Sequence, residues 1–271
     1  MLRLLYPRLR LAVFAGALIP LLGACTGSVG PEGRIRSSNG LAGPAPRVAK
    51  NSEALEHSKK FDVHGIDVSK YQGEIDWSAV ADSGVSFAFI KATEGGDVAD
   101  AKFAQNWAGA RSAGIPRGAY HFAYWCRPWQ EEMAWFERNV PVEPDALPPV
   151  LDVEATPESR TCKKVLYPEE TVATMRNMLE RMERHFGKRP IIYSTVDFYE
   201  AILSTGALSE YPIWVRSTKH HPSVRYGTRK WHFWQYQSDG TVAGIRTAVD
   251  RNAWHGTAGE WKRWVSAQTG G

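Results

Sequence analysis

Two patterns of apolar and polar residues alternate from residue 61 onward. Short runs rich in β-branched and aromatic residues predict eight strands, at residues 61–69, 85–93, 116–124, 148–154, 189–195, 211–217, 231–237 and 247–252. Helical spacing of apolar residues predicts helices over residues 76–84, 100–114, 128–140 and 168–187. This alternation favours a parallel α/β fold, and eight strands favour a closed (β/α)8-like TIM barrel. The later connections are short, so we expect an irregular barrel.

Side chains capable of chemistry stand where these strands end. They are Asp67, Lys91, Glu94, Tyr120, His121, Asp152, Glu154, Tyr193, Trp214, Gln235 and Asp250. The C-terminal ends of barrel strands meet at one mouth, where active sites are built, so we expect these side chains to lie together. Four carboxylates would then share the mouth: Asp67, Asp152, Glu154 and Asp250.

The fourth strand, PPVLDVE, ends in two acids separated only by Val153. Residues i and i+2 of a strand project from one face, about 6.6 Å apart, so Asp152 and Glu154 point together. Two carboxylates this close repel each other, and we expect at least one to keep its proton near neutral pH. Cleavage of a glycosidic bond needs such an acid beside ionised carboxylates. A D-x-E pair alone is more often surface charge; the acids on two other strands favour a glycosidase.

Charge is distributed unevenly along the 271 residues. Residues 1–60 carry nine Lys or Arg against three Asp or Glu, whereas residues 61–271 carry 24 against 26, which gives the globular part a charge of −2. A nucleic acid partner requires a clustered basic face on the domain itself, so we expect none.

The first 25 residues are typical of an export signal. Three arginines precede the apolar run LAVFAGALIPLL, which is too short for a comfortable membrane span. The end of the run, LLGACT, resembles the lipobox of bacterial lipoproteins, which implies a signal peptide over residues 1–24 and a lipid on Cys25. An ordinary secretory signal is the alternative. A Gly-, Pro- and Ser-rich stretch follows, so we expect a flexible linker over residues 25–60.

This reading of the N-terminus implies a location in the cell envelope, with the domain anchored to a membrane through Cys25 and facing the periplasm. Thr26 is not the aspartate associated with retention in the inner membrane of diderm bacteria, so the outer membrane is compatible.

Two further cysteines, Cys126 and Cys162, are a disulfide candidate in an exported protein, with a pair of free thiols as the alternative. His64 and His121 lie near the expected mouth, but no metal-binding spacing such as H-x-H or H-E-x-x-H surrounds them. We therefore expect a hydrogen-bonded structural His64, a groove-lining His121, and neither a metal nor a cofactor.

Seven segments together resemble the glycoside hydrolase family 25 lysozymes, also called Chalaropsis-type muramidases. They are HGIDVSKYQGEIDW, FAFIKATEG, GAYHFAY, PVLDVE, PIIYS, FWQY and VDRN, in the order in which the family has them. The resemblance covers essentially all of residues 61–265. It implies a single catalytic domain over residues 61–271 that cleaves the β-1,4 bond between N-acetylmuramic acid and N-acetylglucosamine in peptidoglycan. We expect the protein to be a monomer.

The resemblance also implies roles for individual residues. It places the catalytic acid at Glu154 with Asp152 beside it, and it matches Asp67 and Asp250 to the family's other mouth carboxylates. Residues that match positions lining the sugar groove are Tyr120, Tyr193, Trp214, Gln235 and Tyr236. Either the substrate's own 2-acetamido group, oriented by Asp152, or a water activated by Asp152 or Asp67 could attack the anomeric carbon, and the sequence leaves both open.

One residue departs from the family pattern: Arg216 stands where a small side chain is usual. It could contact a peptide-stem carboxylate or another anionic group of the substrate, or bridge an acid such as Asp250.

Two other functions stay open at this stage. A chitinase-like barrel also uses nearby acids on one strand, although such enzymes usually carry a longer D-x-x-D-x-D-x-E array, and ALPPV precedes LDVE here. A non-catalytic tethered domain that binds cell-wall glycan is the second alternative. Four crowded acids argue against it, because binding an uncharged glycan does not require them.

Overall fold

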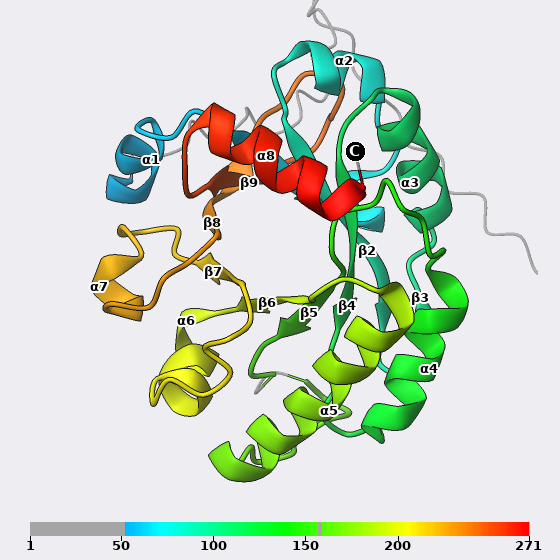
Figure 1. Ribbon diagram of the computed structural model, residues 1–271, viewed down its shortest axis with the longest axis vertical. Coiled ribbons are helices and arrows are strands. Elements are labelled where there is room, and N and C mark those ends of the chain that lie inside the picture. The colour runs from blue at the N-terminus through cyan, green and yellow to red at the C-terminus, as the bar shows by residue number, and fades with distance from the viewer. Residues whose placement is uncertain (1–51, 157–158, 271) are drawn as a thin grey trace, which may run out of the picture. The chain divides into compact units, whose positions relative to one another are not determined.

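Eight strands close into a barrel in the computed structural model, which describes residues 52–156 and 159–270 (Figure 1). The sheet order is β1-β9-β8-β7-β6-β5-β4-β2, and a further pairing between β1 and β2 closes it. The barrel strands are β1 (His64–Val68), β2 (Phe87–Glu94), β4 (Arg117–Phe122), β5 (Val150–Val153), β6 (Ile191–Ser194), β7 (Ile213–Arg216), β8 (Phe233–Gly240) and β9 (Val249–Trp254). A two-residue strand, β3 (Val98–Ala99), pairs with the end of β2 outside the barrel. The predicted closed barrel is confirmed.

The last strand, β9, departs from the predicted all-parallel arrangement. The pairings among the other barrel strands are parallel, but β9 runs antiparallel to both β8 and β1. Antiparallel strands can be joined by a short connection, whereas a parallel crossover needs a dozen or more residues. Only eight residues separate β8 from β9, so the chain reverses there.

The helices cover the barrel unevenly (Figure 1). Each predicted helix is present, as α2 (Trp77–Asp82), α3 (Phe103–Ser112), α4 (Trp129–Asn139) and α5 (Pro168–Phe186). Only short helical turns follow β6 and β7, namely α6 (Val196–Phe198), η2 (Tyr199–Leu203) and α7 (Ser223–Tyr226), and η1 (Lys70–Gln72) follows β1. The barrel is therefore irregular, as its short later connections predict.

The barrel interior below the mouth is filled by aromatic side chains. Phe87 and Phe89 lie fully buried there, and Phe89 stacks on Trp214 with ring centroids 4.7 Å apart. Two glycines make room for these rings: a β-carbon at Gly65 would lie 2.5 Å from the Phe87 ring, and one at Gly118 would lie 2.9 Å from the Phe89 ring. The interior is thus a packed core with one open end.

A C-terminal helix that the sequence analysis did not predict, α8 (Ala258–Thr269), covers the end of the barrel at which the strands begin (Figure 1). Trp261 packs on Phe87 with centroids 5.2 Å apart and on Trp254 with centroids 5.3 Å apart. The helix begins with a capping box between Thr257 and Glu260, a local signal that could have revealed it.

The folded domain begins earlier than predicted. A helix, α1 (Glu53–Ser58), lies within the stretch that we expected to be flexible linker. Ala54 is fully buried and its amide donates to the Lys219 carbonyl at 3.2 Å. Residues 52–60 therefore belong to the domain. The predicted signal peptide, Cys25 and the rest of the predicted linker lie outside the described residues. Within the described ranges, no helix combines the length and apolarity that crossing a membrane requires.

Candidate active site

A cleft of about 340 Å³ opens at the mouth where the parallel strands end. Nine of the predicted site residues line it: Asp67, Tyr120, Asp152, Glu154, Tyr193, Trp214, Arg216, Gln235 and Asp250. Lys91, from the end of β2, lies with them. Four other polar or aromatic residues of the lining were not predicted: Ser69, Tyr71, Gln72 and Phe122. Ser69, Tyr71 and Gln72 belong to the matched segment HGIDVSKYQGEIDW, so the motif itself was the signal.

Two residues predicted to line the sugar groove point away from it. His121 is fully buried and hydrogen-bonded to Thr93 Oγ1 at 2.7 Å and to Glu132 Oε2 at 3.0 Å. The hydroxyl oxygen of Tyr236 lies 3.1 Å from the ring nitrogen Nδ1 of His64. Successive strand residues face opposite sides, so Tyr120 and Gln235, which face the cleft, turn their neighbours His121 and Tyr236 toward the outer layer. The expected substrate contacts of His121 and Tyr236 were wrong.

The structural role expected of His64 agrees with its contacts. Nε2 of His64 lies 2.9 Å from the Phe61 carbonyl, which can only accept, so this nitrogen carries the proton. Nδ1 then accepts from the Tyr236 hydroxyl. Within the described ranges, no group of three or more His, Cys, Asp or Glu side chains is arranged to hold a metal ion.

Asp250 reaches the mouth by a different route from the one predicted. It is the second residue of β9 rather than a residue at a strand's C-terminal end. Because β9 is antiparallel, its beginning lies beside the end of β1, and Asp250 pairs in register with Asp67. Reversal of one strand thus completes the set of four acids.

A chain of hydrogen bonds holds Asp67. Gln235 Nε2 and Asn252 Nδ2 both donate to Asp67 Oδ2, at 3.0 and 2.8 Å. The indole N–H of Trp214 donates to Asn252 Oδ1 at 2.8 Å, and the Tyr193 hydroxyl donates to Gln235 Oε1 at 3.0 Å. An indole nitrogen can only donate, so it orients the Asn252 amide with its N–H₂ toward Asp67. Asn252, whose site role the sequence analysis missed, therefore presents Asp67 as an acceptor.

The pKa of Asp67 reflects two opposing effects. Burial raises it from 3.8 to about 6, although the hydrogen bonds from Asn252 and Gln235 and the charge of Arg216 lower it. Burial and nearby Asp67 raise the pKa of Asp250 further, to about 8, against the charge of Arg216. Asp250 therefore carries a proton over much of the neutral range.

Asp152 and Glu154 form a pair that shares protons. Burial and the negative charge of Glu154 raise the pKa of Asp152 well above its usual range. Burial also raises the pKa of Glu154, although Arg216, Lys91 and the hydrogen bond with Asp152 lower it. Asp152 is 6% exposed and Glu154 is half-buried, so Glu154 is the member of the pair that a ligand can more easily reach.

The aromatic residues lie at two depths of the cleft. Trp214 is 2% exposed and packs edge to face on Tyr193 with centroids 4.5 Å apart, so it forms the floor rather than a platform for a sugar. Tyr71 is 74% exposed at the rim and presents a flat apolar surface to the solvent side. Rings of this kind suit the apolar faces of sugars.

A disulfide between Cys126 and Cys162, with Cα atoms 5.6 Å apart, joins the segments that follow β4 and β5. Next to it, the Trp125 indole donates to the Glu154 carbonyl at 2.9 Å and stacks on Phe198. The predicted disulfide is present and lies beside the backbone that carries Glu154.

Comparison with known proteins identifies a family for the barrel. Residues 66–245 match the family model described as "Glycosyl hydrolases family 25". Lysozyme M1 of Streptomyces globisporus is 36% identical over 210 residues, which cover 72% of this chain and 69% of that one. "Uncharacterized protein YegX" of Escherichia coli (strain K12) is 36% identical over 219 residues, covering 79% of this chain and 77% of that one.

A solved structure shows the same fold. A family 25 glycosyl hydrolase from Bacillus anthracis superimposes with a TM-score of 0.70 at 35% identity, over 75% of this chain and 94% of that one. The family model covers most of the barrel and includes three of the four mouth acids, Asp67, Asp152 and Glu154. The chain therefore belongs to glycosyl hydrolases family 25.

Proposed function

We propose that this protein is a muramidase that hydrolyses the β-1,4 bond between N-acetylmuramic acid and N-acetylglucosamine in peptidoglycan. The observation that carries the proposal is the pair Asp152 and Glu154, whose pKa values are both raised, beside the hydrogen-bonded carboxylate of Asp67. The cleft thus holds both an acid and an anion, the two groups that cleavage of a glycosidic bond needs. Relatives named lysozyme and N,O-diacetylmuramidase support this substrate.

In the proposed mechanism Glu154 protonates the leaving glycosidic oxygen. Asp152 Oδ1 is a buried oxygen without a hydrogen-bond partner among the described residues. An acetamido N–H of the substrate is a donor that fits such an acceptor. Asp152 would thereby orient the acetamido carbonyl oxygen to attack the anomeric carbon, which forms an oxazolinium ion as the bond to the leaving sugar breaks. Water then opens the ion, with the Glu154 carboxylate as base, and configuration is retained.

Mass analysis of fragments released from purified peptidoglycan tests this function. The expected products end in reducing N-acetylmuramic acid. We expect Glu154→Gln to fold normally and to lose cleavage, while Glu169→Gln, at an exposed acid on α5, keeps it. Reducing glucosaminyl ends would instead assign the protein to another class of acetamido-sugar glycosidase. If the wild type binds cell walls but releases no fragments, the protein is instead a non-catalytic tethered domain that binds cell-wall glycan.

We further propose that the protein is exported and lipid-anchored at Cys25 and that it faces the periplasm as a monomer. The support is the basic start, the apolar run and LGAC at its end. Recovery of a Cys25→Ser variant in the membrane fraction would contradict the anchor. Fractionation of the wild type between inner and outer membranes identifies the membrane, and light scattering of the detergent-solubilised protein measures the oligomeric state.

We also propose that the domain acts as a Chalaropsis-type enzyme. A stretch of 65 residues is 37% identical to N,O-diacetylmuramidase of Chalaropsis sp, covering 23% of this chain and 31% of that one. Release of fragments from O-acetylated peptidoglycan, compared with the same walls after deacetylation, tests whether this protein accepts the diacetylated sugar.

A further inference from the structure

The two cations that line the cleft differ in their partners. Lys91 Nζ lies 2.7 Å from Glu94 Oε2 and is thus held by an acid of its own strand. Arg216 is the last residue of β7 and is half-buried in the cleft wall. Its side chain forms no ion pair or hydrogen bond with any residue in ranges 52–156 and 159–270. The cleft therefore contains one arginine whose donors are unused.

The backbone of Arg216 is well supported although its side chain is not. The hydroxyl of Tyr226, which is buried, donates to the Arg216 carbonyl at 2.8 Å and lies 3.0 Å from the Ser194 carbonyl. Arg216 also pairs in register with Gln235, which holds Asp67. The guanidinium thus extends into the cleft from an anchored position. A half-buried guanidinium loses part of its hydration, and an anionic ligand would compensate for that loss.

The charges of the cleft determine where such an anion could bind. The other charged lining residues are the four acids and Lys91, which Glu94 already neutralises. Those of the acids that are ionised repel an anionic ligand, and none of the four attracts one. Arg216 offers a planar fork of N–H donors that matches a carboxylate in bidentate geometry. An anionic group of the substrate can therefore be accepted beside β7 and is disfavoured elsewhere.

The proposed substrate carries such a group on one of its two sugars. N-acetylmuramic acid bears a lactyl ether whose carboxyl is either free or amide-linked to a stem peptide with carboxylates of its own, whereas N-acetylglucosamine bears none. Resting on the muramidase function proposed above, we propose that Arg216 binds a carboxylate carried by the muramyl residue in the cleft. The contact gives the cleft a preference for muramyl glycan over a neutral acetamido glycan.

The test uses the full-length protein and two pairs of glycan strands. One pair carries stem peptides, with its carboxylates free or converted to methylamides. The other pair has been stripped by an amidase, so that only lactyl carboxyls remain, again free or converted to methylamides. KM and kcat are measured at one pH for the wild type, Arg216→Ala and Arg216→Lys. The matched control is Arg225→Ala, at an arginine bound to Glu200 and outside the cleft lining.

We expect Arg216→Ala to raise KM about tenfold or more on the carboxylate member of one pair, the usual size of a charge-assisted hydrogen bond, with kcat changed much less. Its KM on the methylamide strands should equal that of the wild type, Arg216→Lys should fall between, and Arg225→Ala should change nothing. An effect in the stripped pair identifies the lactyl carboxylate, and an effect only in the stem-bearing pair identifies the stem peptide.

Equal changes of KM on carboxylate and methylamide strands in both pairs would overturn the proposal. Loss of Arg216 also removes a charge that lowers the pKa of Glu154, but that effect is common to all four strands and cancels in the comparison within a pair. If Arg216→Ala does not fold, the wild type still decides, because it must bind carboxylate strands more tightly than methylamide strands.

Binding measured by calorimetry separates this proposal from the muramidase function. A wild type that cleaves none of the strands contradicts the muramidase. Its dissociation constants for the free and methylamide strands, compared with those of Arg216→Ala, still report whether Arg216 recognises a carboxylate.

Discussion

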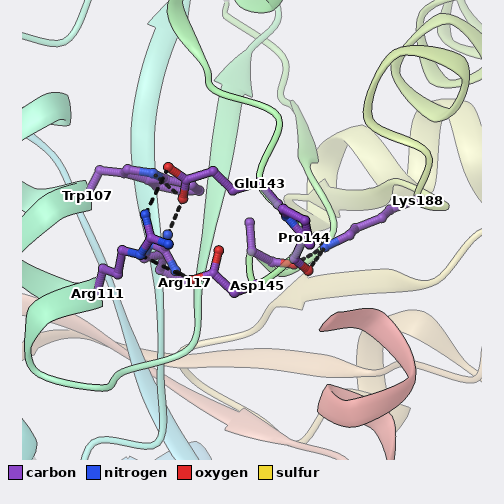
Figure 2. A network of polar contacts seen from close by, with 8 residues as sticks. Trp107, Arg111, Arg117, Glu143, Pro144, Asp145 and Lys188 are labelled. Carbon is purple, nitrogen blue, oxygen red and sulfur yellow. Dashed lines mark hydrogen bonds and ion pairs between the residues drawn. The ribbon is translucent and has the colours of Figure 1, made fainter. Parts of the chain in front are cut away.

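Strand β4 connects two groups of charged residues that obey opposite electrostatic rules. Tyr120, near its end, faces the four acids of the mouth. Arg117, its first residue, lies in a network of mixed charge between α3 and the segment before β5 (Figure 2). In the mouth, acids are crowded with few cations and their pKa values rise. In the Arg117 network, each acid meets an arginine.

The Arg117 network balances its charges (Figure 2). The guanidinium of Arg117 is 2% exposed, bonds Glu143, and donates to Asp145 at 3.2 Å. Arg111 approaches the same two acids at 3.4 and 3.2 Å. Burial alone would raise the pKa of Asp145, but the hydrogen bond and charge of Arg117 and the charge of Arg111 outweigh it and lower the pKa. Trp107 stacks its ring on the Arg117 guanidinium at 4.6 Å.

The two ends of the barrel thus differ in how burial affects the ionisation of their carboxyl groups. When buried side chains of opposite charge lie together, each stays ionised, and the pair holds together the elements that carry them. Burial with like charges keeps protons on carboxyls, which destabilises the fold at neutral pH and supplies an acid for chemistry. Removing a charge should therefore have opposite consequences at the two ends.

The largest expected effect is on catalysis at the mouth. Asp152→Asn replaces one carboxyl oxygen with an amide N–H₂, which cannot accept from the acetamido N–H, and removes one member of the acid pair. We expect kcat on peptidoglycan to fall about a thousandfold, within the range for an acid–base group. The free energy of unfolding should stay the same or rise, because the folded state no longer has to hold a proton on this buried carboxyl at neutral pH. Asp82→Asn, at an exposed acid on α2, is the control. Retained activity would contradict the assignment.

The second effect is on stability in the Arg117 network. Arg117→Met leaves Glu143 with only partial compensation, so we expect the free energy of unfolding to fall by about 3 kcal/mol. kcat of the folded protein should be unchanged. Arg176→Met, at an exposed pair with Glu210, should cost less than about 1 kcal/mol. Urea denaturation measures both variants. A variant at Arg117 that matched Arg176→Met in stability would show that the network is not stabilising.

The third effect is the pH dependence of stability at the mouth. The pKa of Asp250 is raised from 3.8 to about 8 in the folded protein, so the folded state holds this proton more tightly than the unfolded state. The contribution of Asp250 to the free energy of unfolding is complete below about pH 4 and is lost as the pH rises toward 8. We expect Asp250→Asn to remove a decline on the order of 2 kcal/mol between pH 5 and pH 8. Urea denaturation between pH 5 and pH 8 measures this decline. If the free energy of unfolding fell equally with pH in the variant and the wild type, the prediction would be wrong.

The smallest effect has the opposite sign. The pKa of Asp145 is lowered, so its contribution is present above about pH 4 and is lost as the pH falls further. Asp145 is 45% exposed, so solvent screening limits that contribution. We expect Asp145→Asn to cost about 0.5 kcal/mol at pH 7 and nothing at pH 3. Thermal unfolding at the two pH values measures it, and a larger cost at pH 3 than at pH 7 would refute the sign.

Local sequence predicted much of the fold and part of the site. The apolar runs predicted the eight barrel strands, and the periodicity ending at Gly187 predicted α5. Local patterns could not predict which face of a strand is inside. His121 and Tyr236 were therefore assigned to the groove, although each is next in sequence to a residue that faces it.

Sequence by itself determined the membership of the strands, the shared direction of Asp152 and Glu154, and the motifs that identify the family, because each depends on residues close together in the chain. The tertiary structure decided the reversal of β9 that sets Asp250 against Asp67, and the Trp214–Asn252–Asp67 hydrogen bonds. It also decided the Arg117 network. These features join residues 26 to 185 positions apart, and only packing of the closed barrel brings them into contact.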